Sequence, residues 1–395
     1  MTDVGRTARR TEIGCTYEGV DIAADLRPHL KGITYTDALS GESDDVQISL
    51  EDRDGLWAGA WRPQEGHTHR CYIEAPSDVA GRTIRRDCGL ATVDEIDYSH
   101  PPSEIRIKAV SAGITQGLAR TRRTRAWRES SLRAIAAEIA TRAGLDLVFA
   151  APDPGFRRRS RPRPAALPPT PPRTAAEQAD LAGRYGDAIL ARATAAPRTF
   201  SGPTYERVDQ RNETDLAFLL RLCGDYGLAL KVFDQAIAIF LEADLEAAPP
   251  LATIRLGESA VIGYRVSRAT SDTYASATVR YRDPRNGRVY SATHPSPRRN
   301  AEPEEPNLAV TARVESQAEA EQRAQDLLRA RNARGHTGTI TLAGDPAWYA
   351  GATADIEARV LSGRYLVTRV THSTAGGYTT TLDVRRILDE DGRPE

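Results

Sequence analysis

Two stretches of short, alternating segments constrain the fold of this chain most strongly. In residues 46–50 and 105–110 apolar and polar side chains alternate, and Gly, Pro and Asp separate such segments from one another. Because successive side chains of a strand point to opposite faces, this period of two predicts half-buried β strands rather than helices. Residues 92–96 fit a further strand. The region from about residue 14 to residue 117 is therefore expected to form a β barrel or sandwich.

The middle of the chain shows a period of 3.6 residues twice, and each helical pattern leads through a glycine into a strand pattern. Ser130 or Ser131 is the expected N-cap of the first helix, and Gly144 is its expected left-handed end. Asn212 is the expected N-cap of the second helix, and Gly227 is its expected end. The two apolar stripes consist of Leu132, Ile135, Ala136 and Ile139, and of Leu216, Leu219, Leu220 and Cys223. Both helices are expected to lie on one small sheet, which predicts a compact α/β domain.

The β pattern returns after Pro249 and Pro250. Ser316 and Glu319 predict a capped helix that ends near Gly335. Strands are expected at residues 261–266, 275–281, 289–293, 337–342, 352–358, 365–372 and 378–387. This part of the chain therefore predicts a second β domain with one helix packed on it.

Together these patterns predict an α+β protein that is mainly β. The expected segments are an N-terminal tail at 1–12, a first β domain at 13–120, an α/β domain at 121–248 and a second β domain at 249–395. Within the α/β domain, residues 151–203 are an insertion that is rich in Arg and Pro at its start, where the prolines disfavour regular structure. Further along this insertion, Thr174 and Glu177 predict the start of a helix.

The charge balance argues against binding of nucleic acid. Among the 395 residues, 53 are basic and 54 are acidic, so the net charge is -1 and no global field attracts a polyanion. The strongest basic feature is the Arg run at 157–163, whose only aromatic neighbour is Phe156, so stacking platforms for single strands are missing. A solvated loop is the preferred interpretation. A nucleic-acid-binding protein would instead show a salt-sensitive affinity that falls when residues 156–173 are deleted.

No membrane insertion is expected either. The longest apolar runs, such as residues 236–241, are far shorter than the roughly 20 residues that a spanning helix needs. The four cysteines lie far apart and form no CxxC pair, which predicts free and mostly buried thiols.

Candidate metal ligands are few. His67, His69 and Cys71 would share one face of a strand, and they would need Cys88 or an acid to join them as a further ligand. A surface strand with a buried cysteine is the simpler interpretation, so no metal site is predicted. Residues 51–55 resemble the start of a calcium loop but lack its closing acid, so a turn is expected there.

No catalytic motif stands out. The sequence contains no G-x-S-x-G elbow, no H-E-x-x-H pair and no Gly-rich phosphate loop. Acidic residues are numerous enough to supply a glycosidase pair, but no feature selects two of them. No enzyme activity, catalytic residue or cofactor is therefore predicted.

Three motifs, in order along the chain, resemble one known family. Residues 30–37 (LKGITYTD) and 43–54 (SDDVQISLEDRD), followed by Trp57, look like the N-terminal signature of the phage late control protein D family. Residues 210–219 (QRNETDLAFL) resemble the middle-domain helix that this family shares with the spike proteins of type VI secretion. Residues 363–380, which include GRYLV and GGYTT, are similar to the family's C-terminal hairpin.

The resemblance implies a baseplate hub of a contractile tail, built from two tube-like antiparallel β barrels that flank an α/β domain. Such a hub assembles as a homotrimer, and its six barrels form a pseudo-sixfold ring between the hexameric tail tube and the trimeric spike. The resemblance also implies structural or interface roles for a set of motif positions, namely Tyr35, Asp37, Asp44, Asp45, Asp52, Asp54, Trp57, Asn212, Asp215, Phe218, Tyr365, His372 and Tyr378.

The implied partners are the tail tube protein, other baseplate proteins and a separate central spike protein, since the sequence ends at Glu395 soon after the expected second barrel. The implied location is the tail baseplate of a virion or a tail-like particle, after synthesis in the cytoplasm of a host bacterium. An infecting phage, a headless bacteriocin-like tail and another contractile injector all fit. A tail-associated cell-wall hydrolase is the alternative function, and it would need one or two essential acids.

Overall fold

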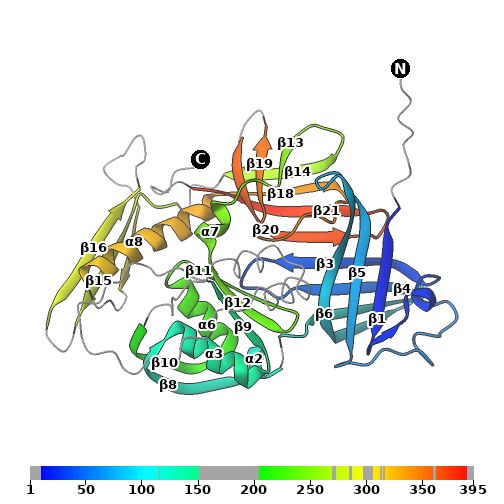
Figure 1. Cartoon of the computed structure of the whole chain (residues 1–395), viewed down its shortest axis with the longest axis horizontal. Helices are drawn as coiled ribbons and strands as arrows, with labels where there is room; N and C mark the ends of the chain where they lie inside the picture. Colours follow the sequence, from blue (N-terminus) through cyan, green and yellow to red (C-terminus); the bar gives the residue numbers. More distant parts are fainter. Residues whose placement is uncertain are drawn as a thin grey trace.

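The N-terminal part of the chain consists mainly of antiparallel strands (Figure 1). The structure, a computed structural model, describes residues 10–114, 116–150, 204–268, 273–283, 287–296, 306–311, 314, 316–358 and 362–388. The N-terminal elements are β1 (Glu12–Tyr17), β2 (Val20–Asp21), α1 (Ala23–Leu26), β3 (Leu30–Ala38), β4 (Asp45–Glu51), β5 (Thr68–Ser77), β6 (Arg82–Ser99) and β7 (Glu104–Ser111). The strands expected at 46–50, 92–96 and 105–110 are confirmed as β4, part of β6 and β7.

The C-terminal part of the chain supplies a second set of strands. These are β13 (Ala252–Arg255), β14 (Val261–Arg268), β18 (His336–Ala343), β19 (Thr353–Glu357), β20 (Gly363–Ser373) and β21 (Thr379–Arg386). They confirm the strands expected at 261–266, 337–342, 352–358, 365–372 and 378–387. Their shared core includes Ile340, Tyr365, Val370 and Leu382, which are all fully buried.

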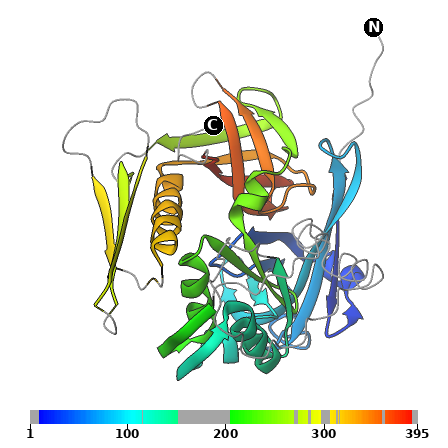
Figure 2. The ribbon, with the colours of Figure 1, turned by 60° about the vertical axis from the view of Figure 1, so that its left-hand side comes forward.

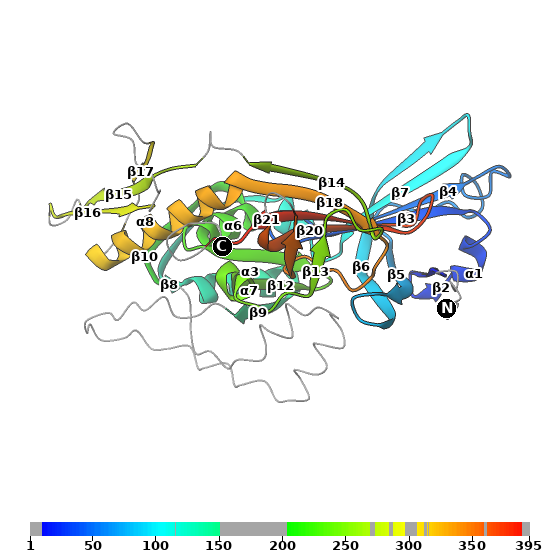
Figure 3. The same cartoon turned by 90° about the horizontal axis from the view of Figure 1, so that it is seen from above.

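The two sets of strands form one continuous sheet of 13 strands (Figure 3). Its order is β14-β18-β21-β20-β3-β4-β7-β6-β5-β1-β2, and β19 and β13 branch from β20. The two sets join through the antiparallel pair of β20 and β3, in which His372 lies opposite Tyr35. Among the described residues the main strand order has free ends at β14 and β2 and does not close. The two β regions, expected as separate barrels, are joined because β3 and β20 satisfy each other's backbone hydrogen bonds.

Three further strands and one helix lie apart from this sheet and are called the wing below. They are β15 (Ser276–Arg282), β16 (Val289–Pro295), β17 (Asn307–Thr311) and α8 (Gln317–Asn332). The wing stands to one side of the molecule (Figure 2), so the expected second β domain consists of two sheets. The hydroxyl of Ser316 caps α8 by accepting from the Glu319 N–H, as expected. Ala320 and Ala324 of α8 are buried against Val279, which gives the wing its own small core.

The middle of the chain combines helices with short strands. Its elements are α2 (Gln116–Ala119), β8 (Arg122–Ser131), α3 (Leu132–Ala143), β9 (Asp146–Ala150), β10 (Thr204–Thr214), α6 (Asp215–Gly224), β11 (Leu228–Phe233), β12 (Ala236–Leu241) and α7 (Glu242–Glu246). The strands β11, β12 and β9 form a small sheet, in which β12 is antiparallel to β11 and parallel to β9. The apolar stripes of α3 and α6 are buried in one core with this sheet, which confirms that both helices pack on it.

The ends of α3 and α6 agree with the expected caps only in part. Ser131 caps α3, and Gly144 ends it with a φ of 71°, both as expected. Asn212 does not cap α6, because Thr214 accepts from the Ala217 N–H and takes that position. Asn212 lies instead in β10 at an irregularity of the β10–β8 ladder, with a φ of 49°.

The end of α6 also differs from the expectation. This helix ends at Gly224, three residues before Gly227. The insertion at 151–203, including the helix expected from Thr174, lies outside the described residues. Among the helices that the structure describes, none combines the length and the apolar character that a bilayer crossing requires.

Candidate functional site

Lys231 and two aspartates form a buried ion cluster where the three parts of the chain meet. Lys231 comes from β11, Asp37 from β3, and Asp44 directly precedes β4. The Lys231 side chain is 1% exposed, and its ammonium pairs with the Asp37 carboxylate and lies 3.4 Å from Asp44 Oδ2. A charge removed from water in this way is retained only when it is paired and hydrogen-bonded. The cluster therefore ties the α/β domain to the N-terminal strands.

Backbone donors complete the hydrogen bonding of both carboxylates. The Ala350 N–H donates to Asp37 Oδ2 at 2.9 Å, and the Ala38 N–H donates to Asp44 Oδ1 at 2.9 Å. Ala350 lies between β18 and β19, so Asp37 contacts the C-terminal strands as well as Lys231. One carboxylate from the 30–37 motif thus holds all three parts of the chain at a single point.

Three other motif residues gather around the joint between β3 and β20. The ring of His372 is fully buried and stacks on Tyr35, with ring centroids 6.3 Å apart. Its Nε2 lies 3.1 Å from the Trp348 carbonyl oxygen, and its Nδ1 lies 3.0 Å from Tyr378 Oη and 3.2 Å from Thr380 Oγ1. Because the carbonyl can only accept, Nε2 donates and Nδ1 accepts. Burial lowers the pKa of His372 to about 3, so its imidazole is neutral.

The acids of the second motif do not join this cluster. Asp52 accepts from the Trp57 N–H at 2.9 Å and from the Ala58 N–H at 3.0 Å, so it caps a local turn. Asp54 is exposed, and Asp45 is half-buried, which raises the pKa of its carboxyl. This arrangement confirms a turn at residues 51–55.

The middle motif builds the core of the α/β domain. The Asp215 carboxylate is buried and accepts from Gln210 Nε2 and from Arg142 Nη2, each at 2.8 Å. Phe218 stacks on Trp127, with ring centroids 6.3 Å apart. The motif residues therefore fall into separate structural groups. Tyr35, His372 and Tyr378 meet at one place, and Asp37 and Asp44 meet at another. The remaining positions belong to neither of these two clusters, namely Asp45, Asp52, Asp54, Trp57, Asn212, Asp215, Phe218 and Tyr365.

Two residues that join the parts of the chain were not found from the sequence. Lys231 had one usable signal, since the chain has only three lysines and this one lies within an otherwise apolar strand. Arg86 of β6 gave no signal. Its guanidinium donates to the carbonyl oxygens of Pro346, Ala347 and Trp348 at 3.0, 3.2 and 3.1 Å, so it fastens β6 to the C-terminal strands.

A second group of side chains surrounds the histidine and cysteine of β5. His69 is 2% exposed, so the expectation of a surface strand is wrong at this position. The Sγ atom of Cys71 lies 3.6 Å from His69 Nδ1 and 2.9 Å from the Sγ atom of Cys15. Cys15, rather than Cys88 or an acid, therefore completes the group, and His67 packs instead against Tyr17, with ring centroids 5.5 Å apart.

The environment favours the neutral forms of His69 and Cys71. Burial lowers the pKa of His69 to about 4. The hydrogen bond to Cys15 and burial raise the pKa of Cys71 well above its usual value.

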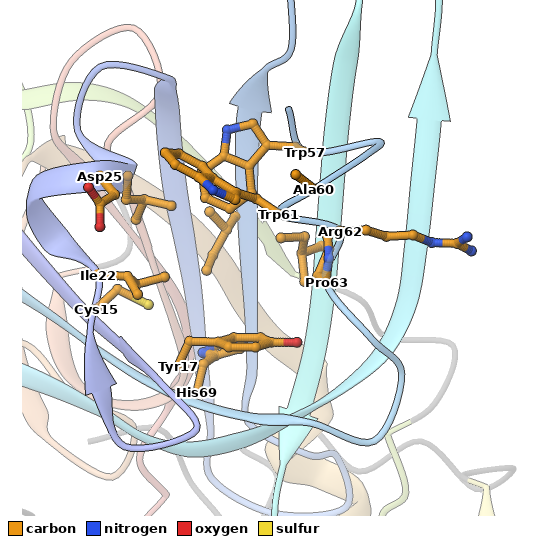
Figure 4. A pocket seen from close by; sticks show the side chains of 13 residues that line it. Cys15, Tyr17, Ile22, Asp25, Trp57, Ala60, Trp61, Arg62, Pro63 and His69 are labelled. Atoms are coloured by element: carbon orange, nitrogen blue, oxygen red, sulfur yellow. The ribbon is translucent and has the colours of Figure 1, made fainter. Parts of the chain in front are cut away.

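A cavity of about 330 Å³ lies beside this group (Figure 4). Its walls carry Tyr17, Trp57 and Trp61, and both Cys15 and His69 face it. Asp25 is the single carboxylate of the lining. Hydrolysis of a glycoside typically needs a pair of carboxyl groups across the scissile bond, which this cavity does not offer.

The comparisons with known proteins agree with the motifs. A family model for the phage tail baseplate hub (GPD) matches residues 179–377. The probable baseplate hub protein of Escherichia phage P2 is 32% identical to this chain over 127 residues. That match covers 32% of this chain and 30% of the P2 protein, so it spans less than a third of either.

Solved structures share the fold over almost the whole chain. The 43 kDa tail protein of prophage MuSo2 from Shewanella oneidensis is 14% identical with a TM-score of 0.63, and the tail protein from Neisseria meningitidis MC58 is 11% identical with a TM-score of 0.65. Each comparison covers 97% of this chain and 99% of the other. At these identities the likeness concerns the fold. Because the family model spans half of the chain and includes the 210–219 motif and most of the C-terminal hairpin, this chain belongs to the phage tail baseplate hub (GPD) family.

Proposed function

We propose that this chain is the structural hub subunit of a contractile-tail baseplate, and that three copies form a ring between the hexameric tail tube and a central spike. The observation that carries the proposal is the family match at residues 179–377, which extends from the α/β domain into the C-terminal strands. In this role the chain needs no catalytic group and no cofactor. Its place is the tail baseplate, in contact with the tube protein, a separate spike protein and other baseplate proteins.

The free edges of the sheet support assembly with further copies. An edge strand offers unpaired N–H and C=O groups, which readily pair with another chain. β14 is such an edge, and its apolar side chains Ile262 and Tyr264 are 61% and 58% exposed. In the proposed ring, neighbouring subunits cover these side chains, and the two β regions of each chain act as its two tube-like domains.

The buried joints inside the chain support the same role. A ring that connects a tube to a spike must keep its parts in a fixed relation when the tail contracts. The Lys231 cluster, the β20–β3 pair and Arg86 together link the N-terminal strands, the α/β domain and the C-terminal strands. The proposed domain limits of 13–120, 121–248 and 249–395 divide the chain into three parts that these buried contacts link.

The mass of the purified chain in solution tests this function. Light scattering after gel filtration should give three times the 43.1 kDa of one chain, about 129 kDa, either alone or after addition of the spike protein. Negative-stain images should then show an open ring. A chain that stays monomeric with the spike protein present contradicts the proposal. Release of peptidoglycan fragments that stops after substitution of one or two acids would identify a hydrolase instead.

A further inference from the structure

Three ligand-type side chains meet on the first strands of the sheet. Cys15 of β1 lies directly opposite Cys71 of β5 in the antiparallel ladder. His69 precedes Cys71 by two residues, so both point to the same face of β5. The two sulfur atoms and a ring nitrogen of His69 lie within 4.8 Å of one another, and all three residues are buried.

The distance between Cys71 Sγ and His69 Nδ1 matches the distance between two ligands of one zinc ion. With Zn–S and Zn–N bonds of about 2.3 and 2.0 Å, tetrahedral geometry separates a sulfur and a nitrogen ligand by about 3.6 Å. The observed distance between Cys71 Sγ and His69 Nδ1 is 3.6 Å. The two sulfur atoms are 2.9 Å apart, and a small rotation of either thiol would open this distance to the roughly 3.8 Å of two zinc-bound thiolates.

The hydrogen bonding of His69 is a second, independent observation. Its ring is almost fully buried, yet Nε2 has no hydrogen-bond partner among the described groups. Nδ1 faces only the Cys71 thiol, which is a weak donor. With its proton on Nε2, the imidazole presents the lone pair of Nδ1 to the cysteine sulfur without a strong donor, and a metal ion could bind Nδ1 there.

The chemistry of the donors selects the ion. Two thiols and an imidazole, with no carboxylate among them, suit a thiophilic ion rather than calcium or magnesium, which prefer oxygen ligands. Cys15 and His69 also line the cavity of Figure 4, so an ion held there has room for a water as its fourth ligand.

We propose that Cys15, His69 and Cys71 form a zinc site that fastens β1 to β5. Such a link would act near the end of the sheet, because β1 is next to last in the strand order, with only the two residues of β2 beyond it. An ion bound across the pair would hold this end of the sheet in register. Since such a site forms only in the folded chain, its binding free energy also stabilises the fold.

Metal content of the full chain tests the site. The protein, produced without a histidine tag and kept reduced, is stripped with a chelator, incubated with Zn²⁺ and passed over a desalting column. Elemental analysis should give about one zinc per chain. Replacement by Co²⁺ should give a thiolate-to-cobalt charge-transfer band, which reports sulfur ligation in the unaltered chain. The unfolding temperature should rise when Zn²⁺ is added back to the stripped protein.

Matched variants separate this site from incidental binding. Cys15→Ser, His69→Gln and Cys71→Ser should each weaken retention of zinc by at least about tenfold, since even the loss of a partner of a ligand has that effect. Cys223→Ser removes a buried thiol of the α/β domain and should leave the zinc content unchanged. A folded, reduced chain that keeps no zinc, or that shows no charge-transfer band with Co²⁺, overturns the proposal. Zinc that Cys15→Ser and His69→Gln retain in full overturns it as well.

Discussion

At the scale of single residues, Lys231 shows how a buried charge can define a fold. Its side chain is almost fully buried, and its ammonium has two carboxylates beside it. An apolar side chain there would remove the cation that pairs with Asp37 and lies beside Asp44. The geometry of this one side chain therefore depends on strands that come from two separate parts of the sequence.

Substitution of Lys231 measures how much the ion cluster contributes to the free energy of unfolding. Lys231→Met keeps most of the length of the side chain but removes the cation beside Asp37 and Asp44, and removal of one partner of a buried pair typically costs about 3–5 kcal/mol. Lys31→Met is the matched control, because Lys31 pairs with Glu104 near the surface, where an ion pair contributes about 0–1 kcal/mol. Urea unfolding followed by circular dichroism gives both values. Equal midpoints for the two variants would contradict a structural role for the cluster.

The buried His372 predicts a pH dependence of stability. Its pKa is about 3 in the folded chain and near 6.5 when unfolded, so between these values the unfolded chain binds the extra proton. Stability is therefore complete above pH 6.5 and falls as the pH drops below it. From pH 7 to pH 5 the loss from this one group is about 2 kcal/mol.

Unfolding free energies of two variants, measured at pH 7 and at pH 5, isolate this effect. Between pH 7 and pH 5, His372→Gln should lose about 2 kcal/mol less unfolding free energy than the unaltered chain loses. This difference does not depend on how stable the variant is at pH 7. His100→Gln removes an exposed imidazole and should keep the loss of the unaltered chain. An unchanged loss in His372→Gln would show that the buried ring is not the group that titrates.

At the scale of helices and strands, local periods were enough to find most elements but not their partners. Alternation at 46–50 and 105–110 predicted β4 and β7, because a period of two is set by the strand itself. The β20–β3 pair depends on residues far apart in sequence, such as Thr34 and Ser373, which are 339 positions apart. No local pattern contains that information. The same holds for the separation of the wing from the large sheet.

The residues of the candidate site, too, could be found from the sequence only in part. The motifs identified Tyr35, Asp37 and His372, which lie at the joint between the two β regions. Lys231 and Cys15 were not identified as members of their clusters, because their partners are known only after β11 and β1 have been placed. The N-cap of α6 failed for a different reason. Asn212 and Thr214 both cap helices well, and the irregular end of β10 decides between them.

Gly32 lies where the two β regions come close together, and a side chain at this position would collide with Ala375. A Cβ atom on Gly32 would lie 2.8 Å from the backbone of Ala375, in the turn between β20 and β21. Since backbone cannot move aside cheaply, Gly32→Ala should destabilise the chain by about 1–3 kcal/mol. Gly224→Ala is the control, because a Cβ atom at that helix end meets no atom within 4 Å. Thermal unfolding of both variants provides the comparison, and a stable Gly32→Ala variant would mean that the contact is looser than described.

At the scale of the whole molecule, the joints lie at interior strands of the large sheet, and the described free edges lie at its two ends. Asp37, Arg86 and the β20–β3 pair join the three parts of the chain, so bending at these places would break buried ionic or backbone hydrogen bonds. The ends at β14 and β2 carry no such links to other described strands. Contacts with further subunits are therefore expected at the ends, and rigidity in between.

A substitution on β14 tests whether subunits contact one another at this end of the sheet. Tyr264→Lys places a charge on the exposed face of the edge strand, and charged side chains on edge strands oppose pairing with another chain. In the proposed trimer this variant should shift the mass in solution from about 129 kDa towards the 43.1 kDa of one chain, with the unfolding midpoint of the monomer unchanged.

Tyr98→Lys is the matched control, because Tyr98 is also an exposed tyrosine but lies on β6, many strands away from β14 in the sheet. It should leave the trimer intact. A trimer that survives Tyr264→Lys but dissociates with Val20→Lys would assign the contact to the opposite edge at β2, whose Val20 is equally exposed. Because β14 and β2 both end the same continuous sheet, the contact between subunits then extends that sheet across the ring at one edge or at the other.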